Sequence, residues 1–125
     1  LDINKPVYVY RNLHKKCWSV RALEGTDRGR VIAHTMEFTL EDATFKVSAV
    51  GRARVLRERQ KNVHAGIVGT LVALECYDLR AAGVLSTQVT YDPYRYDSFV
   101  EMHEGIRIDN SKHVWGCGHD VYASH

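Results

Sequence analysis

The residues with the most suggestive chemistry lie in two segments, one basic and one aromatic. Residues 52–61 read RARVLRERQK and hold five cations against a single acid, Glu58. Residues 91–99 read YDPYRYDSF and place tyrosines and a phenylalanine around Pro93. Guanidinium groups donate paired hydrogen bonds to phosphate oxygens, and aromatic rings stack on nucleobases. Together the two segments predict a site for a ligand that carries both a base and phosphate groups.

Each segment also has a simpler interpretation, and the sequence leaves both open. A basic stretch is commonly a solvated surface, and aromatic residues near a proline turn commonly close a hydrophobic core. In the ligand interpretation, the tyrosines and Phe99 stack on the base, while Arg95, Arg107 or the arginines of the basic segment hold the phosphate. In the simpler interpretation, Arg54, Arg57 and Lys61 form a solvated surface.

No arrangement of residues predicts catalysis, so we expect a protein that is not an enzyme. The nine glycines never take the spacing of a phosphate loop or a dinucleotide fingerprint. His113, Cys117 and His119 offer nitrogen and sulfur ligands, but their spacing matches no common zinc site. We therefore expect neither a metal nor a cofactor. Cys17 and Cys76 lie in apolar strand patterns and are expected in the core.

Most of the elements that must position these segments are predicted to be strands. Alternating β-branched and aromatic residues indicate an antiparallel sheet in the first third of the chain, interrupted near Glu41 and Asp42. A nearly continuous apolar run and a later polar strand extend it. The expected strands cover residues 6–12, 16–22, 30–35, 36–48, 66–77 and 86–91, with short pieces in the tail.

The pattern changes at Ser48, which suits the N-cap of a helix. The next fifteen residues lack proline and are rich in Arg, Leu, Glu and Gln. At about 100° per residue, their apolar side chains share one face and their cations the other. A short helical turn is expected within residues 78–85. These elements predict an α+β fold: an antiparallel sheet, one long amphipathic basic helix and a short second helix.

Composition limits the kind of protein this is. A chain of 125 residues, 45% hydrophobic and 26% charged, suits a single globular domain spanning residues 1–125. The net charge is +2, but without residues 52–61 there remain 12 basic and 14 acidic residues, a balance of −2. An anionic partner is therefore expected at the basic segment. No apolar stretch is long enough to span a membrane, and three widely spaced cysteines suggest a reducing cytoplasm.

Three fragments carry a resemblance to a known family across nearly the whole chain. They are VYVYRNLHKKCWSVRA, FKVSAVGRARVLRERQKNVHAGIVGTLV and VTYDPYRYDSFV, in this order. The run Lys61-Asn62-Val63-His64 after the basic segment is the most specific part. The chain resembles the type-one Thoeris anti-defense proteins, a family of small phage proteins.

The resemblance implies a molecular sponge in the cytoplasm of an infected bacterium. Such proteins bind cyclic ADP-ribose isomers, including glycocyclic ADP-ribose, and withhold them intact from the defence effector. They also bind cyclic dinucleotide and oligonucleotide signals, which extends protection to CBASS-type defence. The family forms homo-oligomers, so a hexamer is expected here, with no membrane partner and no role for nucleic acid.

The resemblance also implies roles for individual residues. Arg54, Arg57 and Lys61 fall in its basic helix as phosphate contacts, and Arg107 is a weaker second contact. Tyr91, Asp92 and Phe99 fall in its base- and ribose-binding region. The family pattern has Asn where Asp92 stands, and a carboxylate there would repel a pyrophosphate. Asp92 is therefore expected to accept a hydrogen bond from a ribose hydroxyl or a base amine.

Two rival functions use the same residues. An RNA- or DNA-binding module would lay the basic segment along a phosphate backbone, with steep salt dependence. A hydrolase would bind the same cyclic signals and return a cleaved product. Release of intact ligand after denaturation separates a sponge from a hydrolase.

Overall fold

The computed structural model describes residues 3–12, 15–46, 53, 57, 66–77, 79–90, 99–102, 105–118 and 120–124. Ten strands and one short 3-10 helix are found in these residues. The elements are β1 Pro6–Asn12, β2 Cys17–Ala22, β3 Val31–Thr35, β4 Glu37–Lys46, β5 Gly66–Ala73, η1 Leu79–Ala82, β6 Ser86–Thr90, β7 Phe99–Glu101, β8 Arg107–Ile108, β9 Asn110–Cys117 and β10 Asp120–Ser124.

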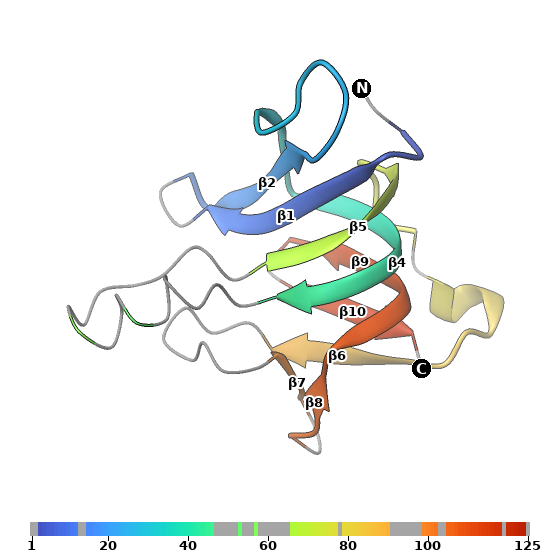
Figure 1. The fold of residues 1–125 in the computed structure, drawn as a ribbon. Coiled ribbons are helices and arrows are strands. Elements are labelled where there is room, and N and C mark those ends of the chain that lie inside the picture. The colour runs from blue at the N-terminus through green and yellow to red at the C-terminus, as the bar shows by residue number, and fades with distance from the viewer. Residues whose placement is uncertain are drawn as a thin grey trace.

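All ten strands join one sheet, in the order β3-β2-β1-β5-β4-β9-β10-β6-β7-β8, and every neighbouring pair is antiparallel. In Figure 1 the long strand β4 arches through the middle of the sheet, with β1 and β2 beyond it on one side and β6 to β8 on the other. The short edge strands β3 and β8 end the sheet and leave little free edge for another chain to pair with.

The expected α+β class is wrong, because the described residues form almost only antiparallel sheet and contain no helix of seven or more residues. Only Ala53 and Arg57 are described within the predicted long helix, and both have helical backbone. The other residues of that prediction lie outside the described ones. The short second helix is a single 3-10 turn, Leu79–Ala82. In the tail, where the sequence predicts only short strand pieces, β8, β9 and β10 complete the sheet.

Several strand predictions are confirmed. β1 covers the predicted residues 6–12, and β2 and β3 differ from prediction by one residue at their start. The expected interruption of β4 is a bulge, where the pairing with β5 shifts between Glu41 and Thr44 and Asp42 has a φ of 50°. The strand predicted over 66–77 ends early, at Ala73.

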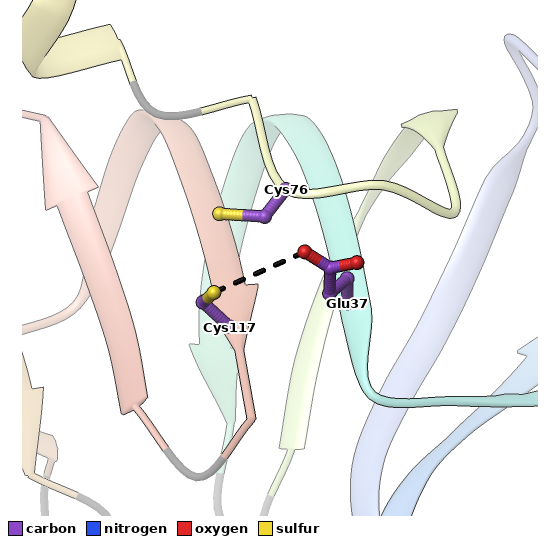
Figure 2. Close-up of side chains that lie close together, drawn as sticks. All are labelled: Glu37, Cys76 and Cys117. Carbon is purple, nitrogen blue, oxygen red and sulfur yellow. Dashed lines mark hydrogen bonds between the residues drawn. The ribbon is translucent and has the colours of Figure 1, made fainter.

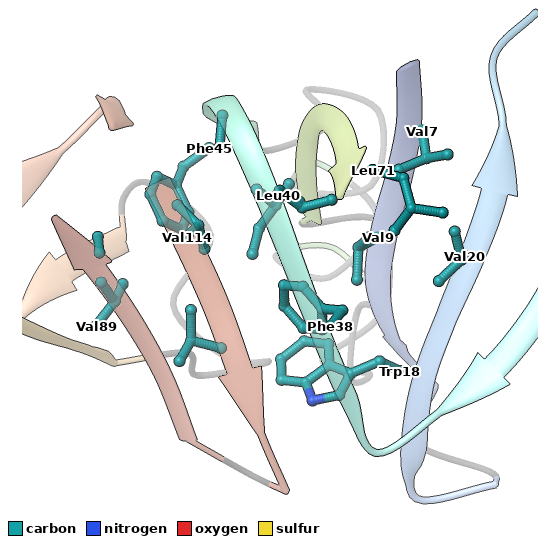
Figure 3. Close-up of a cluster of buried hydrophobic side chains, with 14 residues drawn as sticks. Val7, Val9, Trp18, Val20, Phe38, Leu40, Phe45, Leu71, Val89 and Val114 are labelled. Carbon is teal, nitrogen blue, oxygen red and sulfur yellow. The ribbon is translucent and has the colours of Figure 1, made fainter. Parts of the chain in front are cut away.

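One hydrophobic core fills the concave face of the sheet (Figure 3). In β1 and its neighbours alternate residues point inward, so Val7 and Val9 are fully buried while Tyr8 and Tyr10 face outward. The rings of Trp18 in β2 and Phe38 in β4 meet edge to face at 5.3 Å. β2 and β4 are separated by two strands in the sheet, so this contact requires the sheet to curl around its core.

The curled sheet is fastened by the turn between β9 and β10. The carbonyl of Gly118 accepts hydrogen bonds from Trp18 Nε1 at 2.8 Å and from Arg11 Nη1 at 3.3 Å. Arg11 is buried, and its guanidinium also lies over the Trp18 ring, 5.2 Å from the centroid. Gly116 is needed beside them, because a Cβ there would lie 2.2 Å from Phe38 Cε1.

A second, smaller buried region lies on the outer face of β4, β9 and β10. Trp115 is completely buried there although it points away from the main core, and it stacks on Tyr122 at 6.0 Å. The Arg80 guanidinium of η1 lies 4.5 Å from the centroid of the Tyr122 ring. Residues 74–85 therefore extend the packing on the outer side of the sheet. Among the described residues, no helix is long and apolar enough to cross a membrane.

Candidate anion-binding site

The basic segment is attached at one end of the sheet. β4 ends at Lys46 and β5 begins at Gly66, and these two residues are paired across the strands. The chain therefore leaves the sheet and returns to it at neighbouring points, with residues 47–65 in between. All five cations of residues 52–61 belong to this excursion.

The aromatic segment returns to the sheet near the end of β4. β6 ends at Thr90, which pairs with Val100, and β7 begins at Phe99, which pairs with Ile108. The next residue, Asp109, accepts a hydrogen bond from the backbone N–H of Phe45 at 2.9 Å. The Phe99 end of the aromatic segment is thus linked through Ile108 and Asp109 to the end of β4, where residues 47–65 leave the sheet.

The structure places only some of the predicted contacts. Arg57 is exposed. Phe99 is the first residue of β7, and Arg107 is the first residue of β8, paired with Val100. Phe99 and Arg107 thus lie on short strands near the end of β4, whereas Arg57 lies within the stretch that joins β4 to β5. The other predicted contacts, Arg54, Lys61, Tyr91 and Asp92, lie outside the described residues.

A pair of tyrosines on the outer face of β1 lies beside the attachment point. We call Tyr8, Tyr10 and Arg21 the tyrosine face. The two phenol rings stack at 5.8 Å with 30° between their planes, and the Arg21 guanidinium lies 5.5 Å from the Tyr10 centroid. The rings are half-buried and Arg21 is exposed. Stacked aromatic rings next to a guanidinium can bind a base and a phosphate of one nucleotide.

The strand register aligns the tyrosine face with the basic segment. Tyr10 in β1 pairs with Gly66 in β5, and Gly66 pairs with Lys46 in β4. Tyr10 and Lys46 are thus two strands apart, about 10 Å, on the same face of the sheet. On the other side of Tyr10 the same row continues through Ser19 to His34, whose Nε2 lies 3.4 Å from Lys15 Nζ. Exposed cations therefore flank the tyrosines on both sides.

Gly66 lets Tyr8 lie close to the sheet. A Cβ at Gly66 would be 2.6 Å from Tyr8 Cζ and 2.6 Å from the Val9 carbonyl oxygen, so only glycine fits beneath the ring. Burial raises the pKa of the Tyr8 phenol above its usual value; the Arg21 charge lowers it by a smaller amount, and Tyr10 adds to the rise. Tyr8 is therefore uncharged at neutral pH and does not repel an anion.

A shallow hollow of about 480 Å³ lies next to these strand ends. It follows the bulge of β4 and the start of β9, where Thr44 pairs with Asn110. Its lining is mostly polar and includes the exposed cation Lys112. The lining residues are Asp42, Ala43, Thr44, Asn110, Ser111 and Lys112.

The sequence did not single out the tyrosine face. The period-two pattern of PVYVYRN indicates that Tyr8 and Tyr10 share one face of a strand, opposite Val7 and Val9. It does not indicate that Gly66 would be their neighbour, because that pairing joins residues far apart in the chain. The contacts of Arg21 and Lys46 depend on the same register.

The zinc ligands considered in the sequence are not brought together. His113 and Cys117 lie on the same strand four residues apart, about 13 Å along β9, which is too far for a shared ion. His113 Nε2 instead lies 3.9 Å from Glu41 Oε1. His119 lies outside the described residues. Cys17 is buried as expected, but Cys76 is only half-buried and lies beyond β5.

Comparison with known proteins gives a family but no solved structure. The family described as Mycobacterium phage L5 gene 82 protein matches residues 1–124. The gene 82 protein of Mycobacterium phage L5 is 44% identical over 100 residues, which cover 75% of this chain and 75% of the relative. No solved structure matches the chain. The chain is therefore a phage protein and belongs to the family of the phage L5 gene 82 protein.

Proposed function

We propose that this protein is a phage sponge that binds cyclic ADP-ribose isomers and cyclic oligonucleotide signals and withholds them, unaltered, from a bacterial defence system. This is the function of the type-one Thoeris anti-defense proteins, which the sequence resembles. It would act in the cytoplasm of the infected cell as a homo-oligomer. Membership of a phage protein family is consistent with the proposal.

The observation that carries the proposal is that the basic and aromatic segments are attached to the sheet near one another. Phe45, at the end of the strand from which residues 47–65 leave the sheet, donates its backbone N–H to the Asp109 carbonyl, and Asp109 follows the partner of Phe99. In the proposed site, guanidinium groups and aromatic rings would contact one ligand. The tyrosine face offers a further stacking surface about two strands from Lys46.

The chemistry of sequestration fits what the site offers. A sponge works by affinity and abundance, so it needs no activated nucleophile and no acid–base pair. A cyclic ligand with two or more phosphate charges needs several donors, because an incompletely paired charge is costly to bury. Symmetry in a homo-oligomer would bring the basic segments of several subunits to one ligand.

Calorimetric titration of the full chain with cyclic ADP-ribose isomers and cyclic dinucleotides tests this proposal. We predict that Arg57→Ala weakens binding about tenfold, as expected when one charged hydrogen bond of roughly 1.5 kcal/mol is lost. Arg28→Ala is the matched control, because Arg28 is exposed in the turn between β2 and β3, outside the proposed site. Equal affinity of a folded Arg57→Ala variant and the unchanged protein would remove Arg57 from the site.

The same titrations distinguish the nucleic-acid rival. A protein that neutralises a phosphate backbone loses affinity steeply as salt rises and accepts many sequences. A sponge binds one compact ligand per site at a fixed stoichiometry. Tight binding of single- or double-stranded nucleic acid, with no binding of cyclic nucleotides, would contradict the proposal.

A further inference from the structure

Three potential metal ligands meet on the outer face of the sheet, away from the proposed anion site. They are Glu37 at the start of β4, Cys117 at the end of β9 and Cys76 in the segment after β5 (Figure 2). One oxygen and two sulfur atoms all lie within 4.8 Å of one another, and Cys117 Sγ is 3.9 Å from Glu37 Oε1. Neither cysteine forms a disulfide.

The fold holds these side chains in place through backbone pairing. Glu37 and Cys117 are directly opposite each other in the pairing of β4 with β9, so their side chains leave the sheet on the same side. Two residues along β4, Thr39 Oγ1 donates to the Glu75 carbonyl at 2.7 Å and accepts from the Tyr77 N–H at 3.0 Å. These two bonds hold the residues on either side of Cys76, and so place its thiol over the pair.

We propose that Glu37, Cys76 and Cys117 bind a zinc ion. Zinc prefers thiolate and carboxylate ligands at tetrahedral angles, and Zn–S bonds of about 2.3 Å place two sulfur atoms about 3.8 Å apart. The present spacing is within about 1 Å of that value, so small side-chain rotations suffice. Each thiol releases its proton to solvent as its sulfur binds the ion. Three protein ligands leave the fourth position to water.

The ion would fasten the segment after β5 to the sheet. Cys76 belongs to the chain that continues into η1, whose Arg80 covers Tyr122. Glu37 and Cys117 belong to the strands beneath. Cys117 is five residues along β9 from Lys112, the nearest lining residue of the hollow on that strand, which is about 17 Å of extended chain. Zinc binding is therefore independent of the proposed ligand site, and either proposal can fail without the other.

The test is zinc uptake by the reduced full chain, measured by elemental analysis after removal of free metal. We predict one zinc per chain, with none retained by Cys76→Ser or Cys117→Ser and weaker retention by Glu37→Gln. Cys17→Ser and Glu24→Gln are the matched controls, because Cys17 lies on β2 and Glu24 follows it, both outside the cluster. Both control variants are expected to retain zinc.

A second measurement on the unmodified protein guards against variants that fail to fold. The reduced chain is alkylated with and without Zn²⁺, and the modified cysteines are located by mass spectrometry. We predict that Zn²⁺ protects Cys76 and Cys117 together. Absence of zinc uptake by the reduced chain, or alkylation unaffected by Zn²⁺, would overturn the proposal. A Cys76–Cys117 disulfide whose reduction restores no zinc uptake would likewise overturn it, in favour of a redox pair.

Discussion

Tyr8 shows how a single residue on an outer sheet face becomes suited to bind a ligand. Its ring lies over Gly66, which has no side chain to hold it away from the backbone, and against the ring of Tyr10. This packing half-buries the phenol and raises its pKa, with the smaller effect of Arg21 in the opposite direction. A flat, uncharged surface results, next to the exposed cations Arg21 and Lys46.

The raised pKa of Tyr8 has a measurable consequence at alkaline pH. The unfolded chain releases this proton near pH 10 and the folded chain only above it, so the free energy of unfolding falls as the pH rises through that window. We predict that Tyr8→Phe removes this part of the decline. Urea unfolding of both proteins at a series of pH values from 8 upward measures it. Identical pH slopes for the two proteins would contradict the assignment.

At the scale of elements, β4 connects most parts of the fold. It pairs with β5 and β9, contributes Phe38 and Leu40 to the core, and carries Glu37 and Thr39 on its other face. The Thr39 hydroxyl is buried and binds both Glu75 and Tyr77. One hydroxyl group thus links the long central strand to the segment that follows β5.

Replacing Thr39 with valine tests this link. The side chain keeps its shape but loses both hydrogen bonds, leaving the Glu75 carbonyl and the Tyr77 N–H without their partner. We predict a loss of about 1 to 3 kcal/mol in the free energy of unfolding, together with weaker zinc retention through Cys76. Denaturant unfolding and elemental analysis measure the two effects. Thr26→Val is the control, because Thr26 is exposed in the turn between β2 and β3, outside the zinc cluster. Unchanged stability of Thr39→Val would show that the hydroxyl contributes nothing.

The elements differ in how far the sequence could predict them. The content of β-branched and aromatic residues, with a polar turn between, predicts β1 and β2, and the interruption near Glu41 and Asp42 predicts the bulge of β4. The long helix was inferred from propensity over residues 49–63, a local signal that gave the wrong fold class for a chain dominated by long-range pairing. Gly116 makes β9 hard to predict, because glycine is uncommon in strands. It is needed there to leave room for the Phe38 ring. Cys76 looked like a core strand residue, yet the strand ends at Ala73.

The candidate site could be predicted only in its parts. Composition located the basic and aromatic segments, since charge and aromatic content are properties of the chain itself. Their common attachment depends on the pairing of Phe99 with Ile108 and of Phe45 with Asp109, which no local pattern encodes. The metal cluster is similar: Glu37 and Cys117 are 80 residues apart and meet only through the register of β4 and β9.

At the scale of the whole molecule, the curled sheet keeps two functions apart. Lys46 and Gly66, at one end of β4, mark the attachment of the basic segment, and Glu37, at the other end of β4, belongs to the proposed zinc cluster. The core and the Gly118 contacts hold together the sheet that joins both ends. A preorganised site would suit a sponge, because it loses little entropy when it captures its ligand.

The central claim is that the protein captures cyclic nucleotide signals and leaves them intact. The most direct measurement is to incubate the purified chain with a panel of cyclic ADP-ribose isomers and cyclic oligonucleotides, remove unbound ligand, denature the protein by heat and identify what is released by mass spectrometry. We predict release of an unaltered cyclic ligand in fixed proportion to an oligomeric protein. Release of a cleaved product, or no ligand retained by any oligomeric or monomeric form, would contradict the account.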